Sequence, residues 1–267
     1  MSKRLLIVPL LALLLLYSPW GHGQQSKGTQ NGSAANDTLR VLFVGNSYTY
    51  FYNMPQMVGA LASSTEVPML VRQSTAGGVN WKQHWAGDKG LQTKALIDGH
   101  DWDVVVLQNH SLSTINAPEQ FMEYGKKWIN YIKQRGSTPL LYMTWGRAHN
   151  PLMQQQISNG YEQLGAATGV EVVPVGLVWE AVRHHRPDVQ LYDPDGSHPS
   201  PTGSYLIACI FYAQLTGKPA KGLPHRLTDT DKNGEKLYLS IMPQTDAEFV
   251  QQVAHQVLSN YPKARNK

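Results

Sequence analysis

A serine in one short motif, and an aspartate with a histidine in another, have the residue types that nucleophilic catalysis requires. Ser47 lies in GNSYT (residues 45–49), and Asp195 and His198 lie three residues apart in DGSH, in a loop rich in proline and glycine. A serine hydroxyl attacks a carbonyl when an imidazole takes its proton, and a carboxylate can orient that imidazole. The Asp195–His198 spacing can therefore let the carboxylate hold one imidazole nitrogen while the other nitrogen faces a serine. Each motif also has a simpler interpretation, because GNS after a strand is usually a turn and Asp-x-x-His is common by chance.

Two further segments carry groups that can stabilise a developing negative charge. Gly77 and Gly78 are adjacent, which permits a close backbone approach and lets an N–H group point into a cleft. Gln108, Asn109 and His110 follow the most hydrophobic of the predicted strands (103–107), where polar side chains can donate hydrogen bonds to a substrate oxygen. A flexible loop at the glycines and a loop-capping role for the polar residues are the alternatives.

Three tryptophans and one acidic turn suggest further binding sites. Trp81, Trp85 and Trp145 lie in or after the same loops and are considered as a platform for sugar rings, although most tryptophans lie in cores. The segment 229–234 resembles the start of a calcium loop, but its twelfth position is Ser240 instead of glutamate, which favours a hairpin turn. Cys209 is the single cysteine, which excludes an internal disulfide and a cysteine-based zinc site. We expect neither a metal nor an organic cofactor.

Short β-branched runs alternate with amphipathic stretches after residue 38, and these elements must position the four loops. This alternation predicts an α/β fold with a three-layer α/β/α arrangement around a five-stranded, flavodoxin-like parallel sheet. Loops beyond the carboxyl ends of parallel strands meet at one edge of such a sheet, which brings the four segments together. We expect strands over 40–44, 66–73, 103–107, 138–143 and 170–175, and helices over 54–64, 89–98, 118–135, 152–168, 177–185 and 202–216.

The last part of the predicted single domain (residues 39–267) differs from the alternating part. From about residue 225 the sequence predicts a hairpin turn over 231–234, a strand over 236–241 and a helix over 245–258. Thr245 is the expected N-cap of that helix, because Glu248 follows three residues later. We expect this region to pack across one end of the sheet.

The amino-terminal residues read as a secretion signal. Lys3 and Arg4 precede an apolar run over 5–17, which is shorter than the roughly 20 residues of a membrane-spanning helix. Gly21 and Gly23 are small residues at the two positions that a signal peptidase reads, which predicts cleavage after Gly23, with 1–23 as signal peptide and 24–38 as flexible leader. An uncleaved anchor is the alternative. We therefore expect a secreted or periplasmic protein with no stable membrane anchor after cleavage.

The four segments together resemble the SGNH branch of the GDSL-type esterases and lipases. GNSYT matches the nucleophile motif of that family, with Ser47 as nucleophile, and DGSH matches its last motif, with Asp195 and His198. LYMTW (residues 141–145) and DGSHPSPTGSYL (residues 195–206) further resemble an exported bacterial branch of the superfamily. The resemblance implies a catalytic triad and an oxyanion hole formed by the backbone N–H groups of Ser47 and Gly78, with Asn109. The third motif departs from the Gly-x-Asn-Asp pattern, so Gln108 or His110 can replace Asn109.

The charge balance and the resemblance together set the expected substrate. Removing Lys3 and Arg4 leaves 21 basic against 19 acidic residues, so no basic excess favours a nucleic-acid partner. We expect a small-molecule or polysaccharide ester as substrate. A carbohydrate O-acetylesterase is the leading hypothesis, with Gly77, Gln108, His110, Trp81 and Trp145 as substrate-binding residues. A short-chain lipid esterase and a non-catalytic carbohydrate-binding protein on the same scaffold are the alternatives.

Overall fold

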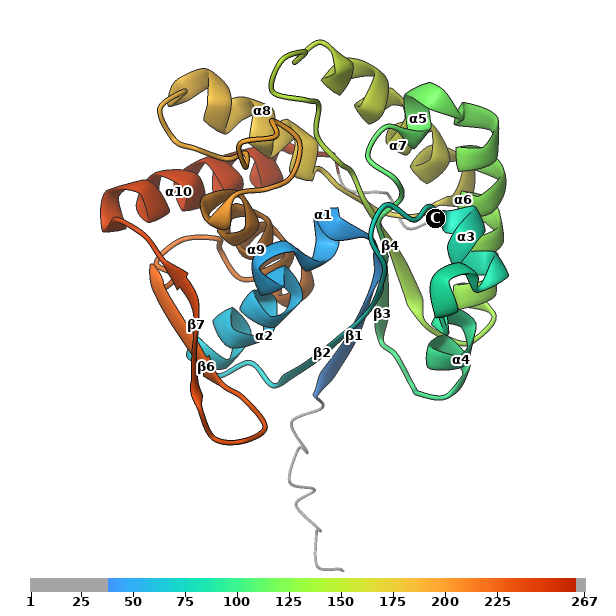
Figure 1. Cartoon of the computed structure of the whole chain (residues 1–267), viewed down its shortest axis with the longest axis horizontal. Coiled ribbons are helices and arrows are strands. Elements are labelled where there is room, and N and C mark those ends of the chain that lie inside the picture. The colour runs from blue at the N-terminus through green and yellow to red at the C-terminus, as the bar shows by residue number, and fades with distance from the viewer. Residues whose placement is uncertain (1–37, 263–267) are drawn as a thin grey trace, which may run out of the picture. The chain divides into compact units, whose positions relative to one another are not determined.

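The five apolar runs form one parallel sheet in the order β2-β1-β3-β4-β5 (Figure 1). The strands are β1 Leu39–Gly45, β2 Met69–Thr75, β3 Val104–Leu107, β4 Thr138–Tyr142 and β5 Val172–Val173. The computed structural model describes residues 38–262. The strand order and the helices on both faces confirm the predicted three-layer, flavodoxin-like α/β fold.

Alternating side chains of the strands divide the core into two halves. Val41 and Phe43 of β1 point to one face, whereas Leu42 and Val44 point to the other, as the period of two in a strand requires. The first face is covered by α2 Met54–Ser64, α8 Val175–His185, α9 Pro201–Thr216 and α10 Gln244–Asn260. The second is covered by α3 Trp81–Ala86, α4 Thr93–Asp98, α6 Pro118–Lys133 and α7 Met153–Thr168. Two four-residue helices, α1 Ser47–Tyr50 and α5 Ser113–Asn116, and two 3₁₀ turns, Phe51–Asn53 and Asp88–Gly90, lie in the connections.

Helix α9 is the most buried helix of the first layer. All residues from Gly203 to Tyr212 are buried, because α9 packs against the sheet, α2 and α10 at once. A helix that is apolar on all sides is expected where no side meets water. A Cβ atom at Gly203 would lie 2.3 Å from the Leu191 carbonyl oxygen, so only glycine fits this approach.

Several expectations about the elements were wrong. The strand predicted over 66–73 begins only at Met69, and the helix predicted over 89–98 begins only at Thr93. The fifth strand is only two residues long, because Pro174 lacks an N–H group for the sheet and α8 begins at Val175. The hairpin of β6 Arg226–Thr230 and β7 Lys236–Ile241 packs on α2, and α10 packs on α8 and α9, so this region covers helices instead of an end of the sheet. Helix α10 begins at Gln244 after Pro243, without a side-chain cap from Thr245.

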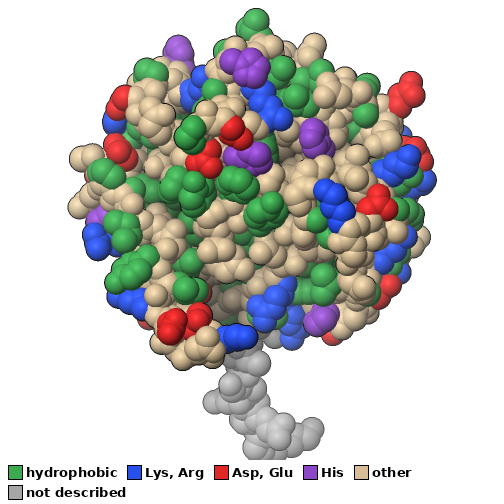
Figure 2. All heavy atoms as spheres, in the orientation of Figure 1, with side chains coloured by type: hydrophobic (Ala, Val, Ile, Leu, Met, Phe, Trp, Pro, Cys, Tyr) green, Lys and Arg blue, Asp and Glu red, His purple; other side chains and the backbone are tan. Residues whose placement is uncertain are grey.

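The surface and the remaining predicted features are ordinary. Figure 2 shows basic, acidic and hydrophobic side chains interspersed over one face. Asp231 accepts hydrogen bonds from the backbone N–H groups of Asn233 and Glu235, and so closes the hairpin turn over 231–234. Cys209 is fully buried in α9. Among residues 38–262, no helix has the length and hydrophobicity that crossing a membrane requires. The predicted signal peptide and leader, except Thr38, lie outside the described residues.

Candidate active site

The predicted site lies at the carboxyl end of the sheet, where the chain changes direction. From β1 the chain passes outward to β2 and then returns, so that β3 pairs with β1 on its other side. The loops after β1 and β3 therefore leave the sheet in opposite directions at this point. Open parallel sheets place ligand sites at such positions. Ser47 follows β1, His110 follows β3 and Arg147 follows β4, whereas His198 comes from the loop before α9.

The turn that carries Ser47 is fixed by buried polar contacts. Asn46 caps the short helix α1, because its Oδ1 accepts a hydrogen bond from the Tyr48 N–H. The Gln108 Oε1 accepts from both the Asn46 N–H (2.8 Å) and the Thr49 hydroxyl (2.9 Å). A Cβ atom at Gly45 would lie 2.4 Å from that same oxygen, so the contact requires glycine at this position.

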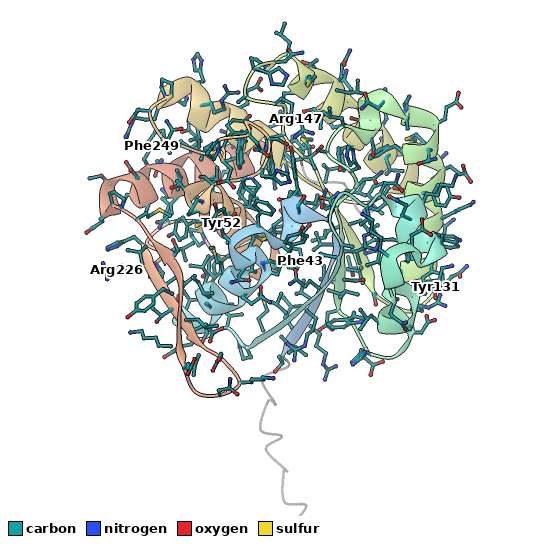
Figure 3. The ribbon with its side chains drawn as sticks, in the orientation of Figure 1. Phe43, Tyr52, Tyr131, Arg147, Arg226 and Phe249 are labelled. Atoms are coloured by element: carbon teal, nitrogen blue, oxygen red, sulfur yellow. The ribbon has the colours of Figure 1, made fainter. Side chains whose placement is uncertain are left out.

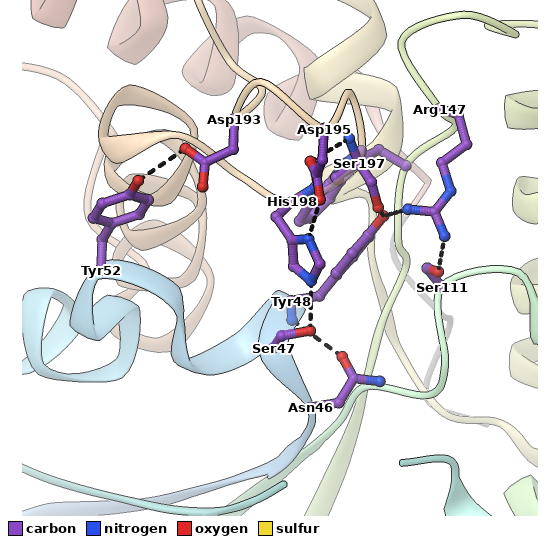
Figure 4. A network of polar contacts seen from close by, with 11 residues as sticks. Asn46, Ser47, Tyr48, Tyr52, Ser111, Arg147, Asp193, Asp195, Ser197 and His198 are labelled. Atoms are coloured by element: carbon purple, nitrogen blue, oxygen red, sulfur yellow. Dashed lines mark hydrogen bonds and ion pairs between the residues drawn. The ribbon is translucent and has the colours of Figure 1, made fainter. Parts of the chain in front are cut away.

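Ser47, His198 and Asp195 form a continuous chain of hydrogen bonds (Figure 4). The Ser47 Oγ is 2.8 Å from His198 Nε2, and His198 Nδ1 is 2.5 Å from Asp195 Oδ2. A carboxylate oxygen only accepts, so His198 donates through Nδ1–H and its Nε2 lone pair faces the serine hydroxyl. The structure therefore brings the two predicted motifs together, although 151 positions separate Ser47 from His198.

Several contacts hold the His198 ring and its carboxylate in place. The Phe51 ring stacks on the imidazole at 4.4 Å, and the Tyr48 ring meets it edge-on at 5.6 Å. Burial raises the pKa of Asp195, but hydrogen bonds from the His198 ring and from the backbone N–H groups of His198 and Ser197 outweigh it. The pKa of this carboxyl therefore falls below its ordinary value.

Two backbone N–H groups beside Ser47 are available to a substrate oxygen. Among residues 38–262, neither the N–H of Ser47 nor that of Gly78 has an acceptor. Gly78 has φ +69°, a left-handed conformation that favours glycine. The Lys89 ammonium donates to the Gly77 carbonyl oxygen at 2.6 Å and so ties this loop to the turn at 88–90.

The polar residues after β3 divide into buried and cavity-lining ones. Gln108 and Asn109 are buried, and the Asn109 Oδ1 accepts from the N–H groups of Trp81 and His110. Neither side chain lines the cavity beside Ser47, whereas His110 does. Of the three residues considered for the third motif, His110 is therefore the one beside Ser47. Burial and the nearby Arg147 lower the pKa of His110, which favours its neutral form.

The cavity at Ser47 has a volume of about 360 Å³ and a lining of polar and aromatic side chains. This lining also includes five residues that were not predicted as site residues: Tyr50, Phe51, Ser111, Arg147 and Ser197. The aromatic run directly after GNSYT could have indicated the first two. Ser197 lies within the DGSH motif and Ser111 directly follows the polar residues 108–110, so both had a local signal. Arg147 had none, since only the folded chain brings it to Ser47.

The predicted platform of Trp81, Trp85 and Trp145 was wrong for Trp81 and Trp145. Trp81 and Trp145 have no exposed surface. Trp145 is stacked between Tyr48 (4.4 Å) and Trp179 (4.2 Å), and Trp81 packs on Phe121 in the core under α6. Neither indole can stack on a sugar ring, because neither reaches the solvent.

Solved structures provide the comparison with known proteins. No family model matches the chain, and no curated protein matches it. A protein from Slackia heliotrinireducens assigned to the SGNH hydrolases is 27% identical, with a TM-score of 0.58, over 66% of this chain and 98% of that protein. The chain has the SGNH hydrolase fold.

A DUF4886 family protein from Bacteroides uniformis shares this fold at 18% identity and a TM-score of 0.69, over 84% of this chain and 96% of its own. An acetyl xylan esterase shares it at 13% identity and a TM-score of 0.54, over 66% and 99%. These neighbours confirm the resemblance to the SGNH superfamily that the motifs indicated.

Within the described part of the chain, no three histidine, cysteine, aspartate or glutamate side chains converge as metal ligands. The site offers a hydroxyl, an imidazole and a carboxylate in hydrogen-bond contact, with two backbone donors nearby. This arrangement suits the attack of an oxygen nucleophile on a carbonyl.

Proposed function

We propose that the chain is a serine ester hydrolase that acts through an acyl-enzyme intermediate. Ser47 attacks the ester carbonyl while His198 takes its proton, and His198 then gives that proton to the departing alcohol. Water next attacks the acyl-serine with His198 as base, which releases the acid and restores the Ser47 hydroxyl. Asp195 orients His198 and stabilises its charged form.

The observation that carries this proposal is the pair of short hydrogen bonds at His198. The ring accepts from Ser47 at 2.8 Å and donates to Asp195 at 2.5 Å, which is the arrangement a general base needs. The free N–H groups of Ser47 and Gly78 supply two donors for the oxyanion, and His110 replaces Asn109 as the side-chain donor of this proposal.

The lining of the cavity favours a short acyl group. The described residues that line it include no aliphatic side chain, so a long acyl chain would gain little apolar contact there. This argues against the lipid esterase and for an acetyl ester. The aromatic residues after Ser47 offer a surface for a sugar, since Tyr50 lines the cavity and Tyr52 is 42% exposed. We therefore propose a carbohydrate O-acetylesterase.

Export of the protein is a separate proposal that rests on the sequence alone. Lys3 and Arg4 before an apolar run over 5–17 indicate secretion, with cleavage after Gly23. Amino-terminal sequencing of the protein recovered outside the cytoplasm should find Gln24 first. A chain that still begins at Met1 would contradict this proposal.

Hydrolysis of p-nitrophenyl esters tests the proposed activity. We expect turnover of the acetate and, because the lining lacks aliphatic side chains, a marked fall in kcat/KM from acetate to octanoate. Ser47→Ala should remove the activity, whereas Ser63→Ala, which removes an exposed hydroxyl on α2, should leave it unchanged. Binding of acetylated xylan without release of acetate would instead support the non-catalytic binding protein.

A further inference from the structure

The active-site cavity contains one cationic side chain without a carboxylate partner. Arg147 lines the same cavity as Ser47 and His198, and it forms no ion pair with any carboxylate of residues 38–262. The arginines at 135 and 186, by contrast, both pair with aspartates. A partly buried cation normally has an anionic partner. The described residues supply no such partner for the Arg147 guanidinium, so a substrate can supply it.

The contacts of Arg147 leave part of its guanidinium free. Its Nη2 donates to the Ser111 Oγ at 2.9 Å, and its Nη1 donates to the Tyr48 hydroxyl (Figure 4). Both acceptors are neutral, and the two contacts use two of the five N–H groups of an arginine. The remaining donors can bind an oxyanion, for which the planar guanidinium is well suited.

The loop that carries Arg147 is attached to the loop of His198. The Ala148 N–H donates to the Gly196 carbonyl oxygen at 2.9 Å, and the Arg183 guanidinium donates to the Ala148 carbonyl oxygen at 3.1 Å. The position of Arg147 relative to His198 is therefore fixed by hydrogen bonds before any substrate binds, which lowers the entropic cost of binding an anion.

The position of Arg147 indicates which part of the substrate carries the charge. The guanidinium lies between two loops, because its partner Tyr48 contacts Ser197, the residue before His198, and its partner Ser111 follows His110. The departing alcohol lies beside His198, which must protonate it, so a group on the alcohol part can reach Arg147 along the loop of His198.

We propose that Arg147 binds an anionic group, such as a carboxylate, on the alcohol part of the ester, so that the enzyme deacetylates acidic sugars such as uronates. This inference rests on the proposed ester hydrolase function. Two acetyl esters of similar size test it: 4-acetoxybenzoate, which is anionic, and its methyl ester, which is neutral. We expect the wild-type kcat/KM to be roughly tenfold to hundredfold higher for the anionic ester, the range of a charged hydrogen bond. That preference should weaken as ionic strength rises.

Variants of two arginines separate binding of the anion from a structural role. Arg147→Gln should remove the preference by lowering kcat/KM for the anionic ester and changing the neutral ester by less than about threefold, and Arg147→Lys should keep part of it. Arg226→Gln is the matched control, because Arg226 is exposed on β6, away from the site (Figure 3). Acetylated oligogalacturonides should likewise be preferred over acetylated xylo-oligosaccharides.

Equal use of the two esters by the wild-type protein would overturn the inference and leave the hydrolase proposal intact. An equal loss for both esters in Arg147→Gln would also overturn it, since Arg147 would then only support Tyr48 and Ser111. Failure of the wild-type protein to hydrolyse either ester would instead reject the hydrolase function itself.

Discussion

Protonation of the buried His84 should make the stability of the fold depend on pH. His84 is 1% exposed, and its Nε2 is 2.9 Å from the Gly45 carbonyl oxygen at the end of β1. A carbonyl oxygen only accepts, so neutral His84 donates through Nε2–H and accepts from the Thr93 hydroxyl at Nδ1 (2.8 Å). Thr93 in turn accepts from Ser74. This network joins β1, β2, α3 and α4 beneath the nucleophile turn.

The magnitude follows from the pKa of His84. Burial lowers this pKa to about 4, and the hydrogen bond to Gly45 only partly opposes the shift. Because the unfolded chain binds a proton near pH 6.5 and the folded chain only near pH 4, stability is greatest above pH 6.5 and falls as pH decreases toward 4. Between pH 7.5 and pH 5 this linkage corresponds to about 2 kcal/mol, and below pH 4 to about 3 kcal/mol.

Urea unfolding at pH 7.5 and pH 5 measures this effect in the wild-type protein and in His84→Gln. Glutamine keeps a donor and an acceptor but does not titrate in this range, so the variant should lose about 2 kcal/mol less than the wild type between the two pH values. His110 also has a lowered pKa and acts in the same direction, so some pH dependence should remain. His185→Gln, which changes an exposed histidine at the end of α8, should behave like the wild type. If His84→Gln loses as much stability as the wild type between these pH values, the argument fails.

Three further predictions concern the nucleophile and the turn beneath it. Ser47→Ala and His198→Ala should each abolish nearly all esterase activity, and steady-state kinetics should show that the double variant is hardly worse, because the residues act as one unit; strictly multiplicative losses would contradict this. Gln108→Ala leaves two buried donors without an acceptor and should lower the free energy of unfolding by about 1–3 kcal/mol in urea, whereas an unchanged value would make Gln108 dispensable. Gly45→Ala places a Cβ atom 2.3 Å from the Thr49 Oγ1 and should lower both that free energy, by about 1–3 kcal/mol, and ester turnover; a wild-type rate would show that the turn adapts.

Much of the fold could be predicted because each long element has a repeated apolar pattern. The predicted bounds of α2 (54–64) and β7 (236–241) are those observed, and α6, α7 and α9 differ from prediction by one or two residues. Short elements lack such a pattern. The six-residue α3 was missed, although Asn80 and Gln83 form a reciprocal cap at its start, because one turn and a half provide too few positions for a period.

The contact of Ser47, His198 and Asp195 could be predicted because these residues lie in short motifs. The elements that surround them could not, because their roles depend on tertiary contacts. Trp145 and Arg147 lie two residues apart after β4, yet one is buried in an aromatic stack and the other lines the cavity. No local pattern distinguishes these two outcomes, since burial is decided by which distant residues pack against the loop.

The same reasoning explains why the third motif could not be assigned from the sequence. Three polar residues in a row follow β3, and alternation along the backbone places them in different environments. Gln108 faces the turn at Gly45, Asn109 contacts the backbone N–H of Trp81, and His110 faces the cavity. The side-chain donor that we propose, His110, is therefore a residue that can also titrate. Burial and the charge of Arg147 both favour its neutral form, in which one ring nitrogen still carries a proton to donate. Arg147 thus has two roles in the proposed mechanism. Together with burial it favours the neutral form of His110, and it offers a partner for an acidic substrate.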